Sequence, residues 1–125
     1  MTSNSAGTSR PWPSEIKLKK AERHLEVTFD DGAHFILPAE YLRVESPSAE
    51  VQGHGPNQKI TMPGKRLVAI TSLEPVGNYA LRIIFSDGHD SGLFTWETLY
   101  RLGHDQEAIW ADYIAALADQ GLSRD

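Results

Sequence analysis

The sequence predicts an α+β fold: an antiparallel sheet from two β-β-β-α units, covered by short helices and a C-terminal helix. Three observations support this prediction. Apolar and polar residues alternate with a period of two in stretches that end in Asp-Gly, which is typical of hairpins with one buried face. The Asp-Gly pattern occurs twice, 56 positions apart. A stripe of apolar residues at helical spacing follows near the C-terminus.

The first unit has three strands. Residues 15–19 precede the alternating stretch 24–29, in which every second residue is apolar. Asp31 and Gly32 then supply the chemistry of a tight turn, because glycine accepts a positive φ at no steric cost. Residues 33–37 therefore return as the third strand.

The second unit repeats this pattern. Residues 66–73 form its first strand, and later positions match those of the first unit at a spacing of 56. The matched residues of the second unit are Leu81, Ile83, Phe85, Asp87, Gly88 and Leu93. In the same order, they correspond to Leu25, Val27, Phe29, Asp31, Gly32 and Leu37 of the first unit. Shared hairpin rules and an ancient duplication explain this similarity about equally well.

Each unit ends in a short helix. Pro38 suits the first position of a helix over 38–43, because its missing N–H has no helical partner there. In the second unit, Thr95 caps a helix over 96–102 and Gly103 closes it.

A longer helix follows, with Asp105 as its cap and Gly121 as its stop. We expect its apolar face to pack on the core, because the sheet needs a cover. That face carries Ile109, Trp110, Tyr113, Ile114 and Leu117.

The two units are joined by residues 45–65, which are rich in Ser, Pro and Gly and show no steady periodicity. This composition predicts a long loop, and binding residues often gather on such loops. The predicted organisation is a disordered tail over 1–14, a single domain over 15–121 and a C-terminal tail over 122–125.

Composition excludes several classes of protein. The chain of 125 residues has no cysteine, so it has no disulfide, no thiolate nucleophile and no cysteine-ligated zinc or iron-sulfur cluster. Its net charge of -5 argues against non-specific binding to nucleic acid. No apolar run approaches the roughly 18 residues that span a membrane, and the N-terminus lacks the apolar core of a signal peptide. We expect a cytoplasmic protein with no nucleic-acid or membrane partner.

The side chains best suited to chemistry lie at the second Asp-Gly turn. Asp87, His89, Asp90 and Ser91 indicate either a metal or acid-base site, or a turn whose side chains bond to its own backbone. The turn is the favoured interpretation, because this composition is common in turns. His54 lies between two glycines and is interpreted as part of a flexible loop. If a metal is bound, its ligands are expected from His54, His89, Asp87 and Asp90.

No other pattern specifies catalysis. His24 and Glu26 would share one face of a strand, as two ligands of an iron site could, but such pairs arise by chance. The chain has neither the Gly-x-Ser-x-Gly of a nucleophile elbow nor a Walker-type phosphate loop. We therefore predict no catalytic residues and no cofactor.

Three stretches of the chain indicate a family. They are YLRVESPSAEVQGHGP at 41–56, GKRLVAITSLEPVGNYALRIIFSDGHDSGLFTW at 64–96 and LYRLG at 99–103. The chain resembles the DUF971 family, also called the γ-butyrobetaine hydroxylase-like N-terminal domain, from about Ile16 to Gly103. Domains of this family stand alone in many bacteria. They also precede the catalytic domain of γ-butyrobetaine and trimethyllysine dioxygenases, and follow the ATPase domain of some Mrp-type iron-sulfur scaffold proteins.

The resemblance has a consequence for metal binding. In the dioxygenase relatives the domain holds a structural zinc through three cysteines and a histidine. The histidine corresponds to His89, whereas the cysteine positions are similar to Ser46, Ser48 and Val51. Because structural zinc generally needs four protein ligands, we predict a metal-free fold. Hydrogen bonds from Ser46, Ser48 and the 87–91 turn would then hold the connecting loop.

The resemblance implies a non-catalytic interaction or accessory domain that serves iron-sulfur or other iron-dependent proteins. Its partner would be a protein, with iron-sulfur assembly machinery as the suggested class. The candidate interaction surface joins His54, His89, Asp90 and Trp96. The alternative is an iron-binding or redox-related protein. A stand-alone hydroxylase is less favoured, because the relatives' oxygen chemistry lies in a separate domain.

Overall fold

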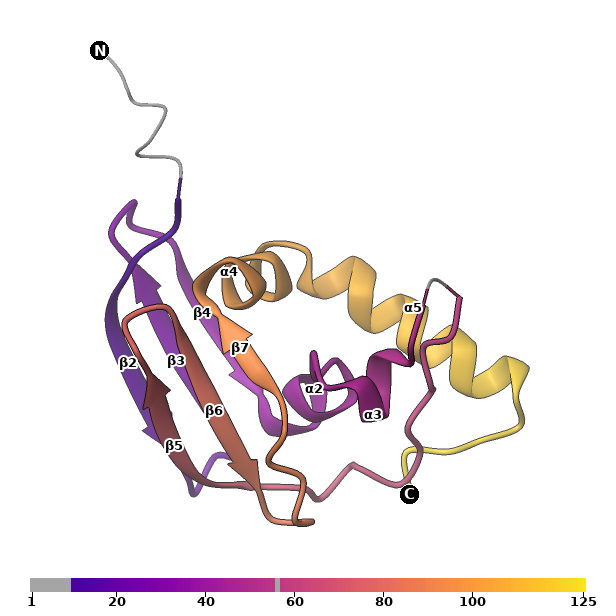
Figure 1. Cartoon of the computed structure of the whole chain (residues 1–125). Helices are drawn as coiled ribbons and strands as arrows, with labels where there is room; N and C mark the ends of the chain where they lie inside the picture. The colour runs from indigo at the N-terminus through magenta and orange to yellow at the C-terminus, as the bar shows by residue number, and fades with distance from the viewer. Residues whose placement is uncertain (1–9, 56) are drawn as a thin grey trace.

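The computed structural model describes residues 10–55 and 57–125. These residues form two three-stranded antiparallel sheets and four helices, which confirms the α+β prediction. Each predicted unit supplies one of the two sheets. Figure 1 shows the strands on one side of the molecule and helices α2 to α5 on the other.

The first sheet has β3 at its centre. Side chains along β3 alternate between the core and the other face, and Leu25, Val27 and Phe29 are all buried. A turn at Asp31-Gly32 joins β3 to β4, as the sequence predicts. The strands are β2 (Pro13–Lys19), β3 (His24–Phe29) and β4 (His34–Pro38), in the order β2-β3-β4.

The second sheet repeats the turn of the first. Phe85 N–H donates to the carbonyl oxygen of His89 at 3.0 Å, just as Phe29 N–H donates to that of Ala33 at 2.8 Å. Gly88 has a φ of +90°, which favours glycine. The strands are β5 (Ile70–Val76), β6 (Ala80–Phe85) and β7 (Leu93–Thr95), in the order β5-β6-β7.

Beyond their turns the two hairpins differ by one residue. Leu25 pairs with Leu37 in the first hairpin, whereas Leu81 pairs with Phe94 in the second. A shift of one residue turns every side chain to the opposite face of a strand. Phe94 is accordingly buried, and Leu93 is 39% exposed. The predicted equivalence of Leu93 and Leu37 is therefore wrong.

The two sheets share one hydrophobic core, which also includes residues of α2 (Ala39–Val44) and α4 (Trp96–His104). Its large, fully buried side chains include Tyr41, Phe29, Phe85, Phe94, Leu25 and Leu37. A smaller cluster of Val44, Tyr113 and Leu117 joins the end of α2 to α5 (Gln106–Asp119).

The start of α4 follows the prediction, but its end does not. Thr95 Oγ1 accepts a hydrogen bond from Thr98 N–H at 3.1 Å, which confirms the predicted cap. Gly103 lies within the helix rather than after it. A Cβ at this position would overlap the ring of Phe35. Gly103 is thus explained by the close approach of Phe35, and its predicted role as a helix stop is wrong.

The end of α5 follows the prediction. Gly121 has a φ of +67°, and Leu122 N–H donates to the carbonyl oxygen of Leu117 at 2.9 Å, as in a Schellman motif. The predicted apolar face is only partly correct, because Ile114 is 39% exposed. Asp105 occupies the N-cap position, but its side chain makes no cap hydrogen bond.

The segment predicted as a loop contains a short helix, α3 (Ala49–Gln52). Ser48 caps it, with its hydroxyl accepting from Glu50 N–H at 3.2 Å. Ile60 N–H also donates to the carbonyl oxygen of Val51 at 2.6 Å, which folds the segment back on itself.

Both predicted tails need revision. Residues 1–9 lie outside the described residues, but Pro13 and Ser14 belong to β2. The segment 122–125 is bound to the domain, because Gly64 N–H donates to the carbonyl oxygen of Ser123 at 3.0 Å and Arg124 pairs with Glu40. None of the described helices is long and apolar enough to cross a membrane.

Candidate functional site

The candidate site is a polar cluster between the second hairpin and the segment that carries α3. His89 lies at its centre, with its side chain only 1% exposed. Its Nε2 atom is 2.9 Å from the hydroxyl oxygen of Ser46, and its Nδ1 atom is 3.3 Å from Oε2 of Glu50. Both ring nitrogens therefore have partners on the connecting segment.

This arrangement has the form of a Ser-His-acid triad. In such triads a histidine between a serine and a carboxylate activates the serine as a nucleophile. Here, however, Ser46 is fully buried, and a Cβ added at Gly92 would overlap its hydroxyl. A substrate carbonyl has no room beside that hydroxyl. The role that the geometry supports is structural, because the Ser46 hydroxyl and both ring nitrogens of His89 find partners inside the cluster.

A second set of contacts fixes α3 against the hairpin. The hydroxyls of Ser48 and Ser91 lie 2.7 Å apart, and Ser91 also donates to Oε1 of Glu50 at 3.2 Å. Gln52 donates from its side chain to the carbonyl oxygen of Ser46 at 2.9 Å. Asp87 bonds to the backbone of its own turn, as predicted, whereas the side chains of His89 and Ser91 bond to side chains of residues 46–50. The predicted contacts of the turn with Ser46 and Ser48 are present.

Asp87 forms the charged part of the cluster. Its Oδ2 atom accepts from Arg43 Nε at 2.8 Å and from Lys65 Nζ at 2.7 Å, and its Oδ1 atom accepts from His89 N–H at 3.1 Å. Burial raises the pKa of Asp87, but the hydrogen bonds from Lys65, His89 and Arg43 together lower it to about 2. Asp87 thus stays ionised at neutral pH and joins three segments of the chain.

The positions that resemble the zinc ligands of the dioxygenases are only partly in contact. Ser46 touches His89 directly, Ser48 bonds to Ser91, and Val51 is fully buried. Within 10–55 and 57–125, no group of three or more His, Cys, Asp or Glu side chains could hold a metal ion. His54, Asp87, Asp90 and His89 therefore do not converge as a set of ligands.

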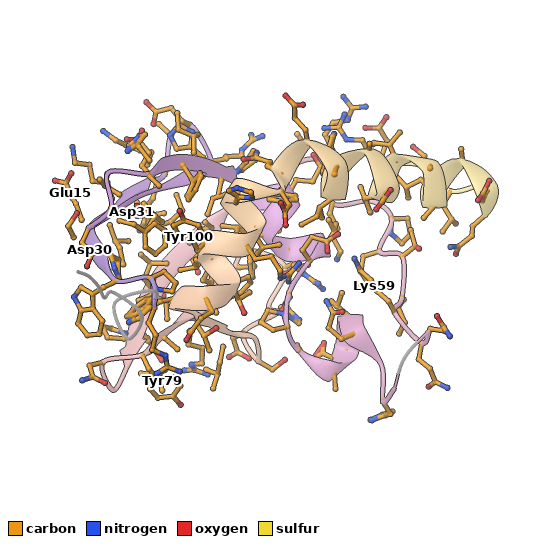
Figure 2. All side chains as sticks on the ribbon, turned by 90° about the horizontal axis from the view of Figure 1, so that it is seen from above. Glu15, Asp30, Asp31, Lys59, Tyr79 and Tyr100 are labelled. Atoms are coloured by element: carbon orange, nitrogen blue, oxygen red, sulfur yellow. The ribbon has the colours of Figure 1, made fainter. Side chains whose placement is uncertain are left out.

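The predicted interaction surface is not brought together. His89 is buried, whereas Asp90 and His54 are exposed. Trp96 lies at the other end of β6, where its Nε1 donates to the carbonyl oxygen of Asn78 at 2.8 Å. Tyr79 follows Asn78 and therefore marks this end of the molecule, whereas Lys59 marks the connecting segment through its pair with Glu45. Figure 2 shows Tyr79 and Lys59 far apart.

The pair considered for an iron site lies on the polar face of β3. His24 Nε2 is 3.0 Å from Oε2 of Glu26, and His34 Nε2 is 3.9 Å from the other carboxylate oxygen. A hydrogen bond from His24 is the main cause of a lowered pKa of Glu26. The two histidines flank the Glu26 carboxylate, and the three side chains do not form a group that could hold a metal ion.

Sequence reasoning missed the partners that complete the cluster. Arg43 comes from α2, Glu50 from α3 and Lys65 from the end of the connecting segment, and only the tertiary fold brings them to the turn. Glu50 had one sequence signal, since it lies two residues after the cap residue Ser48. Arg43 had none, because charged residues in a short helix normally face solvent.

These features define a class of protein: a small α+β domain in which two antiparallel sheets share a core and a buried polar cluster joins the connecting segment to the second hairpin. The family model described as gamma-butyrobetaine hydroxylase-like, N-terminal, matches residues 16–100. The chain belongs to this family, DUF971, and the family indicated by the three sequence stretches is confirmed.

Solved structures show how well the fold is shared. One solution NMR structure of a protein is 50% identical, with a TM-score of 0.82 over 94% of this chain and 92% of that chain. A second is 44% identical, with a TM-score of 0.80 over 99% and 90%. A crystal structure of a DUF971 protein of unknown function from Acidithiobacillus ferrooxidans is 42% identical, with a TM-score of 0.61 over 73% and 91%. The search of curated proteins gives no match.

Proposed function

We propose that this protein is a non-catalytic interaction domain. One observation carries the proposal: the side chains best suited to chemistry are committed to holding the fold. Ser46 is fully buried against His89, and Asp87 is engaged by Arg43 and Lys65. A nucleophile or general base needs access to a substrate, and the buried pair of Ser46 and His89 offers none.

The partner class that we propose is the iron-sulfur assembly machinery or another iron-dependent protein. The support is the resemblance to domains that are fused to Mrp-type scaffold proteins and to dioxygenases. A domain that recurs beside different catalytic units is more consistent with a shared binding role than with a shared reaction.

Affinity capture tests the proposal. The tagged full chain, expressed in its native cell, should retain a specific protein that an unrelated acidic domain of similar size does not retain. The purified chain, supplied with ferrous iron, 2-oxoglutarate and γ-butyrobetaine, should consume no co-substrate. Turnover above background without a captured partner would show that the protein is an enzyme.

The same purified protein separates this proposal from iron binding. We propose that the hydrogen bonds between Ser46, Glu50 and His89 hold the cluster without an ion. Elemental analysis should then find no stoichiometric metal, and chelators should leave the melting temperature unchanged. About one iron or zinc per chain, lost in His89→Ala, would support the metal-binding alternative.

A further inference from the structure

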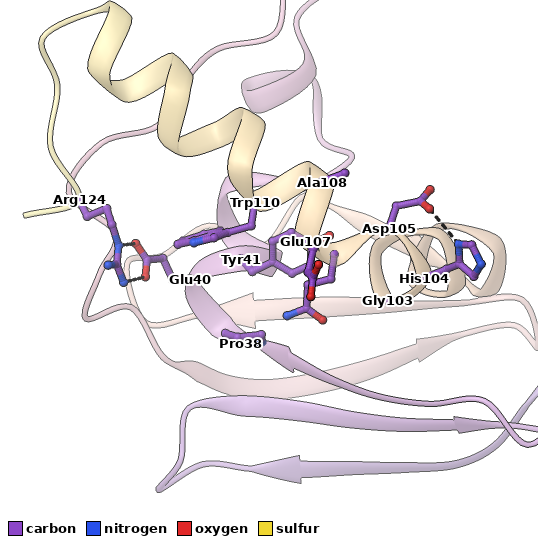
Figure 3. A pocket seen from close by; sticks show the side chains of 11 residues that line it. Pro38, Glu40, Tyr41, Gly103, His104, Asp105, Glu107, Ala108, Trp110 and Arg124 are labelled. Carbon is purple, nitrogen blue, oxygen red and sulfur yellow. Dashed lines mark hydrogen bonds and ion pairs between the residues drawn. The ribbon is translucent and has the colours of Figure 1, made fainter.

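One cavity lies on the helical side of the molecule, away from the His89 cluster. It is an open groove of about 1110 Å³ between the start of α2, the junction of α4 and α5, and the segment 122–125. Figure 3 shows this groove with Trp110 and Tyr41 in its middle. Its volume slightly exceeds the range of about 300–1,000 Å³ that is typical of ligand sites.

The floor of the groove is aromatic. The rings of Tyr41 and Trp110 lie 6.1 Å apart, edge to face. The Tyr41 hydroxyl is already used, because it donates to the carbonyl oxygen of Leu102 at 2.6 Å. Tyr41 itself is only 1% exposed, so the ring surface that the floor offers a ligand belongs to Trp110, which is partly buried. Aromatic ring faces attract cations as well as apolar groups.

The groove already holds one cation from the chain itself. Arg124 binds Glu40 through two hydrogen bonds of 2.7 and 2.8 Å, and its guanidinium lies 5.3 Å from the centre of the Trp110 ring. The Glu40 side chain is only 8% exposed. This end of the groove shows that a buried carboxylate and an indole ring together accommodate a guanidinium.

The other end of the groove has carboxylates without a permanent cation. Asp105 and Glu107 both line it and are exposed, and the Asp105 carboxylate lies 2.8 Å from Nδ1 of the His104 ring. With Glu40 neutralised by Arg124, the rest of the lining is negatively charged. The chain as a whole also has a net charge of -5, which favours the approach of cations.

From this arrangement we infer that the groove binds a segment of a partner protein that carries arginine or lysine. A cationic side chain would lie at Asp105 and Glu107, with its stem against the partly buried ring of Trp110. An extended segment fits better than a small molecule, because the groove is open to solvent rather than enclosed. The inference rests on the proposed interaction function and assigns it a surface and a partner chemistry.

The test uses the full chain and a capped Gly-Arg-Gly-Arg-Gly peptide at low ionic strength. Titration followed by NMR should shift the Trp110 indole signal and the Glu107 amide signal to saturation. A Gly-Glu-Gly-Glu-Gly peptide should cause no shift. Asp105→Asn with Glu107→Gln should weaken binding of the arginine peptide about tenfold.

A matched control variant lies on the same helix. Asp112→Asn with Asp119→Asn removes the same charge from exposed positions outside the groove lining. This variant should bind the arginine peptide within about twofold of the unchanged protein. Equal weakening by both double variants, or shifts spread over the whole acidic surface, would overturn the inference. So would a concentration-dependent dimer that shifts the same signals, because a second copy would then occupy the groove.

Affinity capture with the Asp105→Asn, Glu107→Gln variant separates the two proposals. Loss of a partner that the unchanged chain captures supports the groove assignment. Undiminished capture overturns the assignment but leaves the interaction function standing. Absence of any partner, together with absence of peptide binding, overturns both.

Discussion

At the scale of single residues, Asp87 makes contacts that its position in a turn does not predict. It was predicted as a turn residue, and it does occupy the turn between β6 and β7. Its carboxylate also accepts hydrogen bonds from Arg43, 44 residues earlier, and from Lys65, 22 residues earlier. One side chain therefore ties α2 and the connecting segment to the second hairpin.

Replacing Asp87 with Asn should destabilise the protein in a pH-dependent way. The folded-state pKa of about 2 lies below the ordinary value of 3.8, so ionised Asp87 stabilises the fold. This contribution is full above pH 4 and is lost as the pH falls from about 4 to 2. Because Asp87 is partly exposed, we expect about 1–2 kcal/mol at pH 7.

Urea unfolding at pH 7, 4, 3 and 2 measures this effect. The difference in unfolding free energy between the unchanged protein and Asp87→Asn should shrink toward zero at pH 2. Asp90→Asn is the matched control, because Asp90 is exposed and lies 3.7 Å from its nearest cation, Arg82. Its effect should stay below about 0.5 kcal/mol. A difference for Asp87→Asn that is independent of pH would contradict the electrostatic explanation.

At the scale of secondary structure elements, helix propensity and side-chain packing favour different residues at position 103. Glycine within a helix costs about 1 kcal/mol relative to alanine, so helix propensity alone favours Gly103→Ala. In the structure an alanine Cβ would overlap the ring of Phe35, which packs edge to face on Phe29 and Tyr100. We expect Gly103→Ala to destabilise the protein by about 1–3 kcal/mol.

Thermal unfolding should show a lower midpoint for Gly103→Ala. The control is Gly55→Ala, because an added Cβ there meets nothing within 4 Å. That variant should melt within a degree or two of the unchanged protein. A Gly103→Ala midpoint equal to or above the unchanged value would mean that Phe35 moves aside at no cost and that helix propensity decides.

The hairpins show which parts of an element could be predicted. Local rules gave the strands and the Asp-Gly turns, because alternation and turn chemistry depend on neighbouring residues. They did not give the one-residue shift that buries Phe94 instead of Leu93. The shift arises between His89 and β7, where Ser91 bonds to Ser48 and Glu50, at the start of α3. The helix α3 itself is four residues long, too short for helical periodicity to reveal.

The contact at the centre of the candidate site was predictable from the sequence, but the residues around it were not. His89 and Ser46 could be expected together, because the resemblance placed both at one site. Trp96 could not be excluded by sequence, since seven residues separate it from His89 and β7 carries it to the far end of β6. Contacts of this kind depend on strand direction and register, which alternation alone does not fix.

At the scale of the whole molecule, the segment 122–125 closes the fold. Sequence reasoning treated it as a tail, because it follows a helix stop. Arg124 nevertheless binds Glu40, 84 residues earlier, and Arg66 N–H donates to the carbonyl oxygen of Arg124 at 3.1 Å. The segment thus joins α2, the approach to β5 and Trp110 of α5.

The pair of Glu40 and Arg124 should contribute strongly to stability, because the carboxylate is nearly buried. Arg124→Gln would leave Glu40 ionised without its cation, and we expect a loss of about 2–3 kcal/mol in the free energy of unfolding. Adding Glu40→Gln should restore part of this loss, since the buried charge is then absent. Chemical unfolding of the two single variants and the double variant measures this coupling.

Arg66→Gln is the control, because its partner Asp125 is 70% exposed and the pair should contribute less than about 0.5 kcal/mol. If the effects of the two single substitutions simply add, Glu40 and Arg124 do not depend on each other, and the segment is held by its backbone hydrogen bonds alone.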